Sequence, residues 1–140
     1  MSTRKSAFLS ALFVASCAIA VTAPTFAQTT APECAKMKAL DPDNDGTMDL
    51  DEARKAASAL FDRLDHDKDG TLDHKELSGR MTAKELQAAD PDHDGTIDKR
   101  EFIKVVEARF KAANPDKDGT IDCRELGTPA GKSLLRVLEK

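Results

Sequence analysis

The sequence is poor in the side chains that usually build a protein core. It has no Trp and no Tyr, aromatic residues make up 4% of its 140 residues, and charged residues make up 33%. A chain of this length corresponds to one domain, but its conventional core must be thin. Apolar burial therefore needs help from another source of folding free energy.

Long apolar runs are missing except near the N-terminus. There, Arg4 and Lys5 precede an apolar run from Ala7 to Val21, and a small-x-small site ends at Ala27. This pattern predicts a secretory signal peptide over residues 1–27, cleaved after Ala27, which is too short and wrongly flanked for a transmembrane anchor. The alternative is a lipoprotein anchored at Cys17, but residues 18–27 stay apolar where a lipoprotein would turn polar. We expect an exported, periplasmic protein without a membrane segment.

Basic residues are also fewer than acidic residues. The net charge of the whole chain is −4, and loss of the two basic residues of the leader makes it −6. A small acidic protein of this kind argues against nucleic acid or an anionic membrane as a partner. No nucleophile–base pair is visible either, so the sequence does not predict an enzyme.

What the sequence does contain is a twelve-residue pattern repeated four times, at Asp41–Glu52, Asp65–Glu76, Asp90–Glu101 and Asn114–Glu125. Oxygen-bearing side chains occupy positions 1, 3, 5, 9 and 12, and Gly occupies position 6, where the backbone must turn sharply. This is the ligand order of an EF-hand loop, in which position 7 contributes its backbone carbonyl. Four such loops in register predict four oxygen-ligand sites for hard metal ions, and bound metal would supply part of the missing folding free energy.

The predicted ligands, taken loop by loop, are Asp41, Asp43, Asp45, Thr47, Asp49 and Glu52; Asp65, Asp67, Asp69, Thr71, Asp73 and Glu76; Asp90, Asp92, Asp94, Thr96, Asp98 and Glu101; and Asn114, Asp116, Asp118, Thr120, Asp122 and Glu125. Each of the first three loops offers five carboxylates, more negative charge than a divalent ion neutralises. A trivalent ion gains half as much again in Coulomb attraction at the same radius, so carboxylate excess favours it. The fourth loop starts with Asn114 and should be the weakest site.

Proline and histidine occupy further loop positions. Pro42, Pro91 and Pro115 lie at position 2, where they either stiffen the loop or end the incoming helix, and the sequence leaves both interpretations open. His66, His74 and His93 lie at loop positions that point away from the metal, and we expect solvated side chains there.

The spacing of the loops predicts the architecture. Their starts are 24, 25 and 24 residues apart, so residues 53–64 and 102–113 must each form one amphipathic helix shared by two loops. In the middle connection, Gly79 fits a helix end and Thr82–Glu85 fits a capping box, which predicts a short helix, a turn and a second short helix. The chain then reverses, so loops two and three pair at one end and loops one and four at the other.

Short helices complete the predicted all-α bundle of residues 34–140. We expect a helix over 34–40 before the first loop and a last helix from Thr128-Pro129, while residues 28–33 should be disordered. Cys34 and Cys123 would both fall at the end that carries loops one and four. A disulfide between them is possible, but two unpaired thiols are slightly favoured, because the loop chemistry needs neither residue and disulfide geometry is strict.

The close spacing, Pro at position 2, Asp at position 9 and the stretch F-K-A-A-N-P-D-K-D-G-T-I-D resemble the lanmodulins, the lanthanide-binding EF-hand proteins of methylotrophic bacteria. The resemblance covers essentially the whole mature chain. His66 departs from it, since the family pattern would place Pro there, and Cys34 and Cys123 are not part of the pattern.

This resemblance implies a periplasmic protein that binds lanthanide(III) ions, La to Nd-like, in its first three loops, strongly prefers them to Ca2+ and folds on binding them. We expect three or four occupied sites and a monomer. It also implies a carrier or buffer linked to lanthanide-dependent methanol oxidation, with a periplasmic lanthanide-dependent dehydrogenase or uptake system as partner. Two alternatives remain. One is an exported calcium buffer or sensor, and the other is a dockerin-like interaction module, which Glu at position 12 and the single domain disfavour.

Overall fold

The computed structural model describes residues 32–139 of the chain. The predicted signal peptide, its cleavage after Ala27 and most of the segment 28–33 lie outside the described residues. The described part is mostly helical and contains two very short sheets instead of a closed one, which confirms the predicted all-α class.

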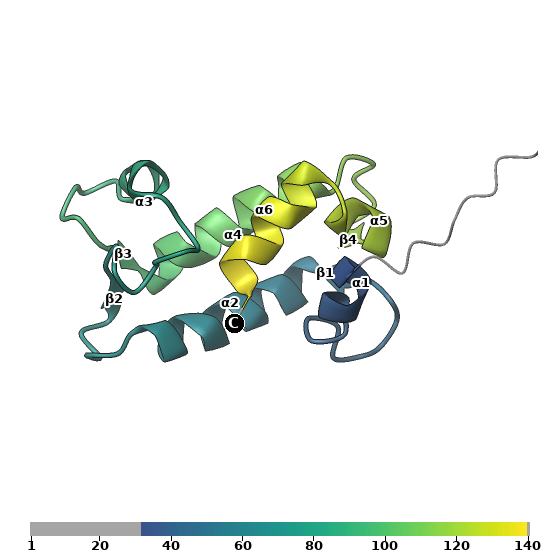
Figure 1. Cartoon of the computed structure of the whole chain (residues 1–140), viewed down its shortest axis with the longest axis horizontal. Coiled ribbons are helices and arrows are strands. Elements are labelled where there is room, and N and C mark those ends of the chain that lie inside the picture. The colour runs from purple at the N-terminus through teal and green to yellow at the C-terminus, as the bar shows by residue number, and fades with distance from the viewer. Residues whose placement is uncertain (1–31, 140) are drawn as a thin grey trace, which may run out of the picture.

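Two helices of 15 residues, α2 (Leu50–Leu64) and α4 (Lys99–Ala113), run along the length of the molecule side by side (Figure 1). Each begins three residues before its predicted start, because the aspartate at loop position 9 is the helix N-cap. Their apolar stripes face each other, with Phe61 and Phe102 at a centroid distance of 6.0 Å. Helix α2 leads from the first loop into the second, and α4 leads from the third into the fourth.

Two antiparallel strand pairs join the loops at opposite ends of these helices (Figure 1). Strand β1 (Met48–Asp49) pairs with β4 (Thr120–Ile121), and Met48 lies opposite Ile121. Strand β2 (Thr71–Leu72) pairs with β3 (Ile97–Asp98), and Leu72 lies opposite Ile97. The four apolar residues at loop position 8 are fully buried, so each sheet anchors two loops in the core.

The middle connection differs from its prediction. Helix α3 (Ala83–Ala89) starts at Thr82 with the expected capping box to Glu85, but residues 74–80 form successive turns instead of a first short helix. Gly79 adopts a left-handed φ of +77°. Only a few residues separate Glu76 from this reversal, too few for a helix to repeat its hydrogen bonds before the chain turns.

The first helix and the cysteines also differ from their predictions. Helix α1 covers Pro32–Met37 instead of 34–40, and the chain then turns into the first loop. After the fourth loop comes a short helix, α5 (Cys123–Leu126). Cys34 and Cys123 form a disulfide with a Cα–Cα distance of 5.1 Å, so the preference for two unpaired thiols is wrong. Helix α1 lies close to α5, and this contact brings together two cysteines that the loop chemistry alone does not link.

The last helix, α6 (Pro129–Leu138), begins as predicted, with Thr128 as N-cap and Pro129 at the first helical position. It lies across the two long helices (Figure 1) and buries its leucine and valine side chains against them. Gly131 lets α6 approach α5 closely, since a Cβ there would lie 2.2 Å from the carbonyl oxygen of Glu125. A thin set of apolar residues thus forms one core along both long helices.

Candidate metal centres

All four loops share one backbone conformation. The residue at position 4 takes a left-handed φ of 58–62° and the glycine at position 6 takes a φ of 89–98° in every loop. The position-4 residues are Asn44, Lys68, His93 and Lys117. Sequence reasoning missed this feature, because Lys68 and Lys117 belong to a residue type that is not enriched at positive φ, unlike Asn and His. The left-handed residues at positions 4 and 6 curl each loop around its own centre.

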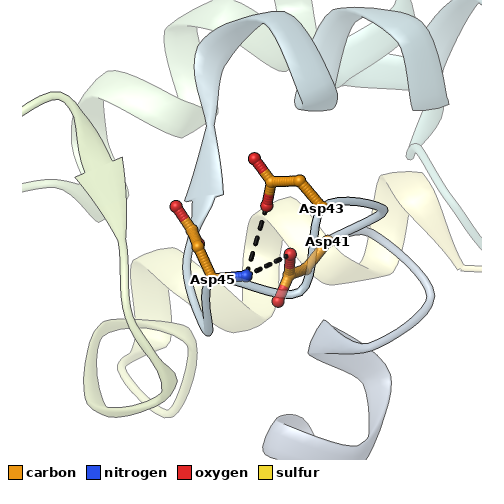
Figure 2. A group of neighbouring side chains, drawn as sticks. All are labelled: Asp41, Asp43 and Asp45. Atoms are coloured by element: carbon orange, nitrogen blue, oxygen red, sulfur yellow. Dashed lines mark hydrogen bonds between the residues drawn. The ribbon is translucent and has the colours of Figure 1, made fainter.

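In the first loop, the curl brings together the carboxylates of Asp41, Asp43 and Asp45, and their ligand atoms lie within 4.8 Å of one another. Asp41 accepts a hydrogen bond from the N–H of Gly46 at 2.9 Å. The Asp45 N–H donates to both Asp41 and Asp43 at 3.2 Å (Figure 2). The third loop gathers the equivalent carboxylates of Asp90, Asp92 and Asp94 in the same way.

The aspartate at position 9 and the glutamate at position 12 form a capping box in each loop. In the first loop, Asp49 accepts from the N–H of Glu52 at 2.7 Å, and Glu52 Oε2 accepts from the N–H of Asp49 at 2.8 Å. The same pair of bonds links Asp73 with Glu76, Asp98 with Glu101 and Asp122 with Glu125. The D-x-x-E spacing is a capping-box signal that could have been read from the sequence. Position 9 therefore starts the outgoing segment and is not gathered with positions 1, 3 and 5.

Each loop also holds one buried carboxylate oxygen without a hydrogen-bond partner: Glu52 Oε1, Asp65 Oδ1, Asp90 Oδ1 and Glu125 Oε1. Asp90 is only 4% exposed and Glu52 8%. Burying a carboxylate oxygen without a partner is costly, so such atoms are normally paired or bound to a metal. A hard cation would satisfy each of these oxygens, and the donor set of carboxylates and carbonyls suits one.

The carboxylates already perturb one another. Burial acts to raise the pKa of Asp41, but hydrogen bonds from the Gly46 N–H and from Asp43 outweigh it, so the pKa of Asp41 is lowered. The backbone hydrogen bond from Asp45 acts to lower the pKa of Asp43, but the contact with Asp41 and burial outweigh it, so that pKa is raised. Desolvation by burial raises the pKa of Glu52. A cation in the loop would remove this mutual repulsion.

The second and fourth loops depart from this arrangement. The second loop gathers Asp65, Asp67 and Glu76, which brings the position-12 glutamate into its acidic group. In the fourth loop, Asn114 Oδ1 accepts from the N–H of Lys117 at 2.7 Å. Within residues 32–139, no group of three acidic side chains gathers there at the same distance. The predicted weakness of the fourth site is consistent with this difference and stays a prediction.

The histidine side chains are not members of these acidic groups. Among the described residues, none of the three belongs to a group that could hold a metal ion. The His66 side chain is 76% exposed, and its ring Nδ1 lies 2.6 Å from the carbonyl oxygen of Leu64. Over the same described range, no helix is long and apolar enough to cross a membrane.

Comparison with known proteins gives two matches. The EF hand family matches residues 58–81 and 83–106, which include the second and third loops. Lanmodulin of Methylorubrum extorquens is 56% identical over 62 residues, which is 44% of this chain and 47% of the relative. The match thus spans about half the length of this curated relative. Both comparisons support a metal-binding protein, and together with the geometry of the loops they support a lanmodulin-like EF-hand protein.

Proposed function

We propose that this protein binds trivalent lanthanide ions selectively through its EF-hand loops and folds on binding them. The observation that carries the proposal is the buried carboxylate oxygen without a partner in every loop. The proposed selectivity for trivalent ions rests on charge, because each of the first three loops carries five carboxylates at its predicted ligand positions. Their mutual repulsion falls most when the ion carries three positive charges.

In the proposed complex, positions 1, 3, 5, 9 and 12 supply side-chain oxygens and position 7 supplies its backbone carbonyl. The first loop would use Asp41, Asp43, Asp45, the carbonyl of Thr47, and Glu52, with Asp49 acting directly or through water. The equivalent residues of the other loops would act alike. The gathered acids and the unpartnered oxygens support this assignment.

The loops should act as two pairs, the first with the fourth and the second with the third. The antiparallel registers of β1 with β4 and of β2 with β3 support this arrangement. Because α2 and α4 each connect one pair to the other, we propose that the two helices are shared between adjacent loops. Metal binding at one end would then order helices that also lead to the other end.

The cellular role rests on the resemblance to lanmodulin and on the leader. We propose cleavage after Ala27 and a metal-binding domain over 34–140 in the periplasm. Helix α1 begins at Pro32, so the predicted disorder of segment 28–33 does not hold for its last two residues. In the periplasm the protein would act as a lanthanide carrier or buffer linked to lanthanide-dependent methanol oxidation. Three trivalent ions would change the net charge of the mature chain from −6 to +3. The bound ions neutralise the crowded carboxylates of the loops, and this supplies a driving force for folding on binding.

The test is a titration of the metal-free mature protein with La3+ and, separately, with Ca2+, followed by far-ultraviolet circular dichroism. La3+ should induce helix at micromolar concentration, and Ca2+ should need at least about a hundredfold more, a gap of about 2.7 kcal/mol per site. An equal response to both ions would leave the calcium buffer or sensor as the better interpretation.

Two matched variants assign the response to the loop ligands. Asp45→Asn removes one negative charge at position 5, whereas Asp51→Asn removes one at position 11, where the side chain is 72% exposed and pairs with Arg54. Asp45→Asn should weaken La3+ binding at the first loop, and Asp51→Asn should leave it nearly unchanged. Equal weakening of La3+ binding by both variants would show that the overall negative charge of the loop, and not coordination by Asp45, governs binding.

A further inference from the structure

The second loop differs from the other three at position 2, where it has His66 instead of proline. Proline has no N–H to donate, so Pro42, Pro91 and Pro115 cannot form a hydrogen bond there. The His66 N–H donates to Glu76 Oε1 at 2.9 Å. The other oxygen, Glu76 Oε2, accepts from the N–H of Asp73 at 3.1 Å. Both oxygens of this glutamate are therefore held by backbone donors.

The additional hydrogen bond coincides with a different position of the glutamate. Glu76 lies in one group with Asp65 and Asp67, with ligand atoms within 4.8 Å of one another. In the first and third loops, the corresponding group contains positions 1, 3 and 5 and leaves out Glu52 and Glu101. Three carboxylates repel one another at this distance, and a donated N–H offsets part of that repulsion.

We propose that the His66 backbone N–H is a positioning group that holds Glu76 in the second metal centre before an ion arrives. This inference rests on the proposed function. Each carboxylate oxygen has two lone pairs, so Glu76 can keep its hydrogen bonds and still coordinate an ion. Glu52 and Glu101 have no donor at position 2 and need the ion to draw them inward. The second loop therefore loses less conformational freedom on binding and fills first.

A competing explanation is that the imidazole ring of His66, and not its backbone N–H, holds Glu76, and variants can separate the two. Ring atom Nδ1 lies 4.0 Å from Glu76 Oε1, beyond hydrogen-bond distance. His66→Ala removes the ring and keeps the N–H, whereas His66→Pro removes both. We expect proline to be compatible with this loop, because the other three loops carry it and share with the second loop the left-handed φ at positions 4 and 6.

The experiment is a titration of the 15N-labelled mature protein with less than one equivalent of La3+, which is diamagnetic. The amide signals of Gly46, Gly70, Gly95 and Gly119 report the four loops separately. In the parent and in His66→Ala, the Gly70 signal should change first. In His66→Pro, the affinity of the second loop should fall about tenfold, as expected for loss of one hydrogen bond to a charged group.

A reciprocal variant makes the test independent of any folding defect in His66→Pro. Pro91→Ala adds the missing N–H to the third loop and should move the Gly95 signal earlier in the titration. Equal filling of the second loop in His66→Pro and His66→Ala would overturn the inference, as would an unchanged third loop in Pro91→Ala. If the parent does not bind La3+ at all, the proposed function fails; if it binds with no preference for the second loop, only this inference fails.

Discussion

The two ends of the molecule carry the same kind of loop pair in different surroundings. At one end, the first and fourth loops are flanked by α1 and α5, which the Cys34–Cys123 disulfide joins covalently. At the other end, the second and third loops are connected by turns and α3, and the described residues contain no covalent link there. Figure 1 shows the two ends separated by the length of α2 and α4.

The second end is fixed by polar contacts instead. Glu85 Oε1 accepts from Arg109 at 2.9 Å and from Arg136 at 2.7 Å, while Glu85 Oε2 caps α3 through Thr82. One carboxylate thus joins α3 to α4 and α6. The same kind of loop pair is therefore supported by a covalent bond at one end and by a charged network at the other. The two supports should respond to different treatments.

Breaking the disulfide should have the largest effect. The two cysteines are 89 residues apart, and a ring of this size contributes up to about 4.5 kcal/mol in the chain-entropy model. Cys34→Ser with Cys123→Ser should lower the free energy of unfolding of the La3+-loaded protein by several kcal/mol, measured with urea. Amide hydrogen exchange should rise more in the first and fourth loops than in the second and third.

Single variants provide the control. Cys34→Ser alone and Cys123→Ser alone should each match the double variant, because either one opens the same ring. Unchanged stability in all three, or equal loss of protection at both ends, would mean that the disulfide does not distinguish the ends.

The sequence predicted the helical class, the last helix and the start of α3, because these depend on local signals. Apolar residues at helical spacing mark the long helices, and Thr128-Pro129 and Thr82–Glu85 are caps that act within a few residues. The turns over residues 74–80 were not predicted, since Gly79 was interpreted as the end of a first short helix, which does not form. The disulfide was not predicted because it depends on the approach of α1 to α5, which no local pattern encodes.

The candidate site was predictable in composition and less so in geometry. The repeated spacing selected the acids, and the structure gathers positions 1, 3 and 5 of the first and third loops. It does not gather position 9, because Asp49 and its equivalents cap the outgoing segments. Glu76 was predicted as a ligand like Glu52 and Glu101, but the sequence did not foresee that only Glu76 joins the acidic group of its loop. This difference accompanies a backbone hydrogen bond from His66, which no ligand pattern encodes.

Removing the charged network should have an intermediate effect. Glu85→Gln keeps the size of the side chain but removes the charge that Arg109 and Arg136 share. Because hydrogen bonds to charged groups contribute about 1.5–3 kcal/mol, we expect a loss of this order in urea unfolding of the La3+-loaded protein. Glu107→Gln, which removes a charge paired with one arginine, Arg54, whose side chain is 43% exposed, is the control and should cost less than about 1 kcal/mol.

The Glu85 effect should depend on pH. The backbone hydrogen bond from Thr82, then the Thr82 side chain and the charges of Arg109 and Arg136, lower the pKa of Glu85 against the opposing effect of burial. Its stabilisation is therefore fully present above the usual glutamate pKa of 4.5 and is lost as the pH falls through the lowered value. The stability difference between the parent and Glu85→Gln should be constant from pH 7 to 5 and shrink below that. A difference that grows on acidification would contradict this assignment.

The smallest expected effect concerns the fourth loop, the one member of the disulfide-linked pair that lacks a position-1 carboxylate. Asn114→Asp restores the fifth carboxylate and the oxygen that can accept from the N–H of Gly119, as Asp41 does from Gly46. The present bond from the N–H of Lys117 to Asn114 Oδ1 would have to give way to that arrangement. We expect La3+ affinity at this loop to rise about tenfold, or about 1.4 kcal/mol, with the Gly119 amide signal as the local readout. Asp116→Asn, which removes another carboxylate from the same loop, should shift it the opposite way. If the parent already binds four La3+ ions with equal affinity, carboxylate number does not rank these sites, and the disulfide-linked end is as strong as the other.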